Sequence, residues 1–117
     1  MKRRRSDLYE FRGRWRDQVF GDHHISHAAF KVAYLLASFV TMDRTMDTYL
    51  DTGRVEIFPS HDTLAHQARV ASDTVYRAVN QLVDRGHLER GKRGNQFSGS
   101  NTYLLVIRQA ARAGARS

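Results

Sequence analysis

Apolar residues between Pro59 and Gly86 recur at helical spacing in two successive groups. The first group, which Ser60 can cap by accepting from a free backbone N–H of the first turn, is Leu64, Ala65 and Ala68. The second group forms a continuous stripe: Val75, Ala78, Val79, Leu82 and Val83. Gly86 follows it at the place where a left-handed residue usually ends a helix. The pattern predicts two helices joined by a tight turn at residues 69–71.

The stripe of the second helix also predicts which of its side chains face outward. If the stripe packs on the domain, the polar residues face solvent: Ser72, Asp73, Tyr76, Arg77, Asn80 and Gln81. Side chains of these types hydrogen-bond base edges or phosphates in DNA. Arg77 is the strongest candidate for a phosphate or guanine contact, whereas Asn80 and Gln81 lie one turn further along. Asp73 either accepts from a cytosine or caps the helix, and Thr74 more often bonds locally or to phosphate.

The chain before this pair predicts two more helices and a strand. Residues 1–6 are expected to form a disordered basic arm, and residues 7–20 a weak amphipathic helix with Leu8, Phe11, Trp15 and Val19 on one face. Ser26 begins a stronger helix, and its expected buried face is Ala29, Phe30, Ala33, Leu36, Ala37 and Val40. Residues 41–53 lose the periodicity and predict a loop with at most a turn of helix. Residues 54–57 alternate and predict a short strand before Pro59.

A hairpin is expected directly after the second helix. Residues 87–90 and 101–107 predict its strands, and the Gly- and Ser-rich residues 91–100 predict its turn. The polar groups on and beside this turn are Arg90, Lys92, Arg93 and Asn95. We expect them to contact DNA phosphate or the minor groove, because each cation there releases a condensed counterion.

Several positions of residues 59–88 match a known motif. They are Pro59-Ser60, Leu64-Ala65, Thr74-Val75, Arg77, Leu82, Gly86 and Leu88. In this pattern the chain resembles the winged helix-turn-helix domains of GntR-type bacterial regulators and of phage and plasmid replication proteins. The resemblance implies an α+β fold, in which three or more helices pack on a small antiparallel sheet with a wing hairpin. It implies such a domain over residues 25–107, after a basic arm and helix at 1–24 and before a basic tail at 108–117.

The resemblance also implies how DNA would be bound. The second helix would enter the major groove, the wing would clamp the backbone, and a homodimer would read two half-sites. Ser60 would be first a helix cap and secondarily a phosphate contact. The chain departs from the usual motif at Arg69, where glycine is common, and at Ala71, where serine or threonine usually caps the second helix.

The charge distribution agrees with a polyanionic partner. The 117 residues carry 19 Lys and Arg against 12 Asp and Glu, a net charge of +7. By segment, the net charge is +4 over residues 1–21, −3 over 22–68 and +6 over 69–117. Basic ends around an acidic middle favour binding to nucleic acid over uniform solubilisation.

Other classes of site find little support in the sequence. There is no cysteine, and the spacing of His23 and His27 is completed by no carboxylate, so neither a metal nor another cofactor is expected. No catalytic motif stands out, which argues against an enzyme. The apolar stretch within residues 28–40 is interrupted by Lys31 and is too short to span a bilayer, and no secretory signal follows the first residues. A cytoplasmic protein without membrane contact is expected.

The sequence is therefore consistent with three functions. The favoured one is sequence-specific binding of double-stranded DNA by a transcriptional regulator. The second is a replication-initiation module, which the Ser100-Asn101-x-Tyr103 segment also resembles. The third is a protein–protein module that uses Phe11, Trp15 and the first helix as its contact surface.

Overall fold

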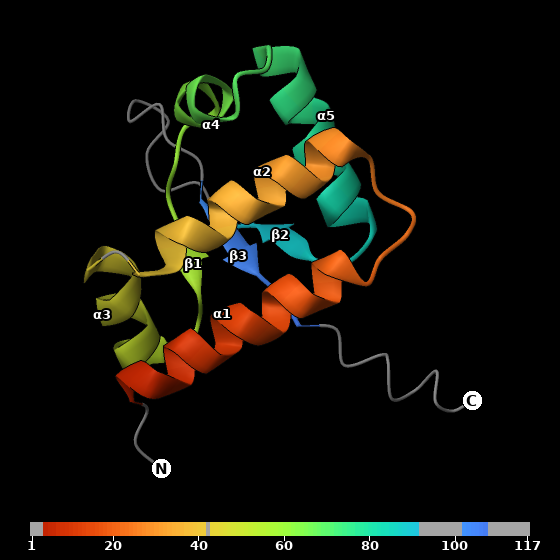
Figure 1. The fold of residues 1–117 in the computed structure, drawn as a ribbon. Coiled ribbons are helices and arrows are strands. Elements are labelled where there is room, and N and C mark those ends of the chain that lie inside the picture. The colour runs from red at the N-terminus through yellow and green to blue at the C-terminus, as the bar shows by residue number, and fades with distance from the viewer. Residues whose placement is uncertain (1–3, 42, 92–101, 108–117) are drawn as a thin grey trace.

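The computed structural model describes residues 4–41, 43–91 and 102–107, which form a mixed α+β fold (Figure 1). This part of the chain contains five α-helices, one 3-10 helix and three strands. In chain order they are α1 (Arg5–Phe20), α2 (His27–Ser38), η1 (Phe39–Thr41), α3 (Asp43–Thr52), β1 (Glu56–Ile57), α4 (His61–Ala68), α5 (Ser72–Asp84), β2 (Leu88–Arg90) and β3 (Tyr103–Leu105).

The three strands form one small antiparallel sheet in the order β1-β3-β2. Leu104 of β3 pairs with Glu56 of β1 on one side and with Glu89 of β2 on the other. Tyr103 and Leu105 alternate with Leu104 and are buried, as expected for a strand with one face on the core. The last strand therefore lies in the middle of the sheet, between the strand that precedes α4 and the strand that follows α5.

Helix α2 is central to the helical part of the core, because it packs against α1, α4 and α5. The apolar stripe of α5 faces inward as predicted: Val75, Val79 and Leu82 are each 0 % exposed. In Figure 1, α4 and α5 lie together at the upper side, and α3 lies on the opposite side of the fold from α5. The packing thus fixes one face of α5 and leaves the other to solvent.

Helix α1 belongs to the same core. It begins at Arg5, where the Asp7 carboxylate accepts a hydrogen bond from the backbone N–H of Arg4 (3.0 Å). The prediction of a disordered arm is therefore wrong for Arg5 and Ser6, which belong to α1. Residues 1–3 lie outside the described part of the chain. Trp15 is fully buried with Leu8 and Val19.

Helix α2 begins as predicted. The Ser26 hydroxyl oxygen accepts from the backbone N–H of Ala29 at 3.1 Å. The buried face differs at one expected position, because Phe30 is 37 % exposed. Its ring packs on Phe20 of α1, with 4.6 Å between ring centroids, and Val32 is buried in the core.

The prediction of a loop at residues 41–53 is wrong for residues 43–52. Residues 43–52 form α3, which buries Thr45 and Met46 and packs Tyr49 against the core. The Thr45 hydroxyl donates to the backbone carbonyl of Glu56 (2.9 Å), so the helix is held to β1 by a polar side chain. A threonine on the buried face interrupts the apolar pattern on which the prediction relied.

The turn between α4 and α5 contains both positions, Arg69 and Ala71, at which the chain departs from the winged helix-turn-helix pattern. Arg69 has φ 59° and ψ 47°, a left-handed conformation that usually selects glycine. Ala71 precedes α5 and makes no side-chain capping bond. Gly86, at φ 84°, ends α5 as predicted, and His87 N–H donates to the carbonyl of Leu82 in a Schellman arrangement.

Replacing Arg69 with glycine is expected to raise the free energy of unfolding by about 1 kcal/mol, because glycine adopts this left-handed conformation without a Cβ clash. Urea denaturation of the purified protein measures the change. Arg69→Ala is the matched control: it removes the same side chain but keeps the Cβ, and it should give no gain. Equal stability of the glycine and alanine variants would contradict the explanation.

Candidate nucleic-acid interface

The outer face of α5 carries polar side chains along its first two turns. Ser72, Asp73 and Arg77 are exposed, and Tyr76 is 55 % exposed. Asp73 lies in the first turn, where its negative charge complements the helix dipole. These four predicted residues therefore lie on the exposed side of α5, away from the buried stripe.

Tyr76 is held by an aromatic neighbour. The ring of His61, the first residue of α4, meets the Tyr76 ring edge-on at 5.6 Å and stacks on Tyr103 at 6.4 Å. Burial lowers the pKa of His61, and the nearby Arg90 charge lowers it further, while Asp62 opposes the shift. His61 is therefore uncharged at neutral pH and supports Tyr76 by packing.

Two of the predicted residues, Asn80 and Gln81, make contacts within the protein. The Asn80 amide oxygen accepts from the Arg90 guanidinium, which joins α5 to the start of the β2–β3 hairpin. The Gln81 amide oxygen accepts from the backbone N–H of Ser26 (2.7 Å) and so anchors α5 to the beginning of α2. Both amides position α5, and neither contact is evident from the sequence.

A hollow of about 290 Å³ lies on the surface between α5 and the start of α2. Ser26 and Ala28 line it from α2, and Thr74, Arg77, Ala78 and Gln81 line it from α5. The positive end of the α2 dipole and the Arg77 side chain thus border the same surface depression.

Of the remaining predicted residues, Ser60 caps a helix and the others lie outside the described part of the chain. Ser60 is partly buried, and its hydroxyl accepts from the Thr63 N–H (3.1 Å) while donating to the Thr63 hydroxyl (3.0 Å). It acts as a cap, as predicted. Lys92, Arg93 and Asn95, as well as the tail at 108–117, lie outside the described residues.

A buried polar cluster fixes the other end of α5, and sequence reasoning missed it. Asp22, whose side chain is 1 % exposed, lies in the α1–α2 connection. Its carboxylate accepts two hydrogen bonds from the Arg85 guanidinium, at 2.9 and 3.1 Å. The same carboxylate accepts from His87 Nε2 (2.8 Å) and from the backbone N–H of His24 (2.9 Å).

The cluster extends to α1 and to the end of the sheet. Gln18 Nε2 donates to His87 Nδ1 (2.8 Å) and to the carbonyl of Val106 (2.9 Å), and Trp15 Nε1 donates to the His87 carbonyl (2.8 Å). Because Nδ1 accepts, the His87 proton is assigned to Nε2, which faces Asp22. The hydrogen bonds from Arg85 hold the pKa of the Asp22 carboxyl well below its usual range, against the opposing effect of burial. The carboxylate therefore stays charged and joins α1, α5 and the sheet.

A metal site and a membrane-spanning helix are both absent from the described residues. Within residues 4–41, 43–91 and 102–107, no three His, Asp or Glu side chains come close enough together to hold a metal ion. Of the helices in that part of the chain, none has the length and apolar character needed to cross a membrane. Comparison of the chain with protein-family models, with curated proteins and with solved structures gave no match.

Proposed function

We propose that the chain is a winged helix-turn-helix protein that binds double-stranded DNA in a sequence-specific manner and regulates transcription. The observation that carries this proposal is the division of α5 into two faces. Val75, Val79 and Leu82 are fully buried, while the consecutive residues Tyr76 and Arg77 are exposed to solvent. A helix anchored in this way presents hydrogen-bonding side chains to the major groove.

The order of the elements supports the winged helix-turn-helix interpretation. Helix α2 precedes β1, the α4–α5 pair follows, and β2 and β3 pair antiparallel directly after α5. The contact between Asn80 and Arg90 brings the start of this hairpin beside α5. A hairpin that begins there is well placed to contact the backbone next to the groove that α5 occupies.

The hollow between α2 and α5 supports a phosphate contact. The Ser26 end of α2 carries the positive end of its dipole, and Arg77 borders the same depression. A DNA phosphate seated there would meet the Arg77 guanidinium and the first turn of α2 together. Because Asn80 and Gln81 are engaged within the protein, base reading falls to the first two turns of α5.

The protein–protein alternative uses Phe11, Trp15 and the first helix as its contact surface. Its proposed contact residue Trp15 is 0 % exposed, and its indole N–H is bonded to His87. Phe11 is only partly buried but packs against the core. Trp15 is therefore not available as a contact residue, and both side chains hold α1 to the rest of the fold.

The proposal predicts salt-dependent binding to selected duplexes. Selection from a random pool should recover a common site, and affinity for it should fall roughly a hundredfold or more between about 50 and about 200 mM salt. Fluorescence anisotropy with the selected duplex measures this dependence. Failure to bind any duplex, or binding that salt leaves unchanged, would contradict the proposal.

The symmetry of the recovered sites separates the two DNA-binding roles. An inverted repeat would support a homodimeric transcriptional regulator, because the symmetry of such a site mirrors that of the protein. Directly repeated sites would instead support a replication-initiation module.

A further inference from the structure

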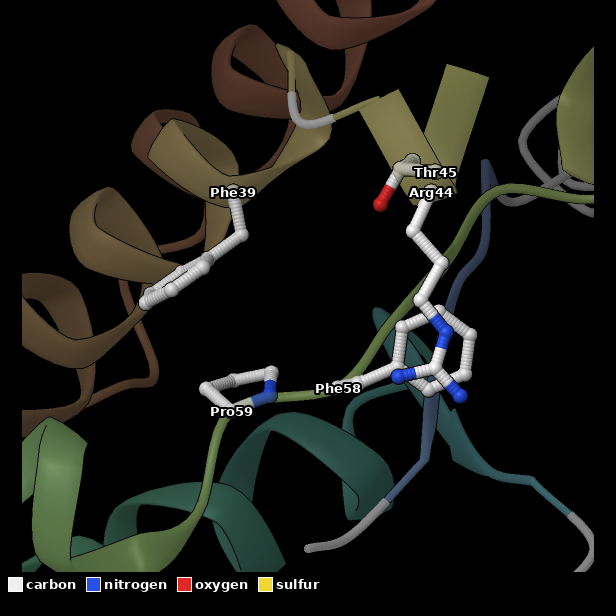
Figure 2. A pocket seen from close by; sticks show the side chains of 5 residues that line it. All are labelled: Phe39, Arg44, Thr45, Phe58 and Pro59. Carbon is white, nitrogen blue, oxygen red and sulfur yellow. The ribbon is translucent and has the colours of Figure 1, made fainter. Parts of the chain in front are cut away.

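A small pocket lies beside α3, between η1 and the segment that joins β1 to α4 (Figure 2). Its volume is about 170 Å³, and it is lined by Phe39, Arg44, Thr45, Phe58 and Pro59. A cavity of about 150 Å³ with apolar walls is sufficient to bind a benzene molecule. The pocket therefore has the size of a single aromatic ring.

The walls of the pocket suit a flat apolar group. Figure 2 shows the Phe39 ring on one side, Phe58 across the opening and the Pro59 ring below. Pro59 is buried, whereas both phenylalanines are half-buried and keep part of their ring surface open. A ring entering here would contact two aromatic side chains and a pyrrolidine, which favour aromatic partners.

Arg44 adds a positive charge to this apolar pocket. Its guanidinium carbon lies 3.9 Å from the centroid of the Phe58 ring, and the side chain is exposed. Stacking on an aromatic ring orients the guanidinium plane and leaves its N–H donors free for a carboxylate. No ion pair between residues of the described segments includes Arg44, although Asp47 lies one turn further along α3.

The Thr45 hydroxyl is not available as a donor to a ligand, because it is already used within the protein. The Thr45 side chain is buried, and its hydroxyl already donates to the carbonyl of Glu56 at 2.9 Å. It closes the pocket beside α3 without offering a second donor. A ligand's negative group would therefore be bound by the guanidinium alone.

We propose that this pocket binds a small aromatic carboxylic acid, with its ring between Phe39 and Phe58 and its carboxylate on the Arg44 guanidinium. The ring-sized volume selects the aromatic group, and the stacked arginine selects the carboxylate over a neutral substituent. This site is separate from the outer face of α5 and does not depend on DNA binding.

The test is a titration of the full chain with benzoate, followed by the backbone amide signals of Phe39, Arg44 and Phe58 in NMR spectra. We expect saturable one-to-one shifts at these residues, and binding at least about tenfold weaker for the neutral analogue benzyl alcohol. Arg44→Gln should weaken benzoate binding by a similar factor. Arg54→Gln, which removes an exposed arginine outside the pocket, should leave it unchanged.

Three results would overturn the proposal. Benzoate could leave the pocket signals unshifted, benzyl alcohol could bind as tightly as benzoate, or Arg44→Gln could bind benzoate as the unmodified chain does. Because Arg44 is exposed, its substitution should keep the fold intact, and an unchanged amide spectrum outside the pocket verifies this.

Discussion

Replacing Asp22 with alanine is expected to lower the free energy of unfolding by about 3 kcal/mol, the lower end of the usual cost of removing one partner of a buried ion pair, because the Arg85 side chain is 36 % exposed. The loss is large because Asp22 accepts from three groups at once: the Arg85 guanidinium, the His87 ring and the His24 backbone. His87 is fully buried, and its Nε2–H would lose the Asp22 carboxylate as an acceptor. Urea denaturation measures the change.

Two further variants test whether the loss of stability is specific to the Asp22 carboxylate. Asp17→Ala removes an exposed carboxylate from α1 and should change stability by no more than about 0.5 kcal/mol. Asp22→Asn keeps the shape but removes the charge, and it should fall between the alanine variant and the unmodified chain. If Asp22→Ala were as harmless as Asp17→Ala, the cluster would not hold α1 and α5 together.

The same carboxylate predicts how stability depends on pH. Its pKa in the folded chain lies well below the value of about 3.9 for an unfolded aspartate. Asp22 therefore contributes fully above about pH 5, and its contribution is lost as the pH falls below about 4 toward the folded pKa. From about pH 5 down toward the folded pKa of Asp22, the unmodified chain should lose stability more steeply on acidification than Asp22→Ala does. Parallel curves would contradict the low folded pKa.

Arg77→Ala is expected to weaken binding to the selected duplex by about 1–3 kcal/mol, or roughly fivefold to 150-fold. Arg77 is exposed on the face of α5 opposite the buried stripe and borders the hollow at the start of α2. It would therefore contact either a base edge or a phosphate. A loss of discrimination between selected and altered duplexes would indicate a base contact, whereas a uniform loss with a smaller salt slope would indicate a phosphate.

The matched control is Arg54→Ala. It removes the same charge from the connection between α3 and β1, on the opposite side of the fold from α5 in Figure 1. It should weaken binding only through the small change in net charge. Equal losses for the two variants would mean that the chain binds DNA by its overall charge alone.

The α4–α5 pair was predictable because its signals are local. The buried stripe of α5, the Ser60 cap and the left-handed Gly86 each depend on residues within one or two turns, and all three are confirmed. Helix α3 was missed because the buried face that signals a helix includes Thr45, whose hydroxyl is satisfied by a distant carbonyl. Local pattern reading cannot supply that partner.

The contacts that position α5 could not be predicted, because their partners are remote in sequence. Asp22 and Arg85 are 63 residues apart, and Gln81 and Ser26 are 55 apart. In sequence Asp22 follows a glycine and precedes two histidines, so it is typical of a surface turn. Asn80 and Gln81, predicted as DNA contacts from their outward position, instead make bonds that only the folded arrangement brings together.

Amide NMR signals recorded during titration with the selected duplex would show whether the exposed face of α5 binds the DNA. We expect the largest shifts at residues 72–77 and at Ser26 across the hollow, and little change in α1 and α3. Shifts concentrated on α1 or α3, with α5 unaffected, would contradict this expectation.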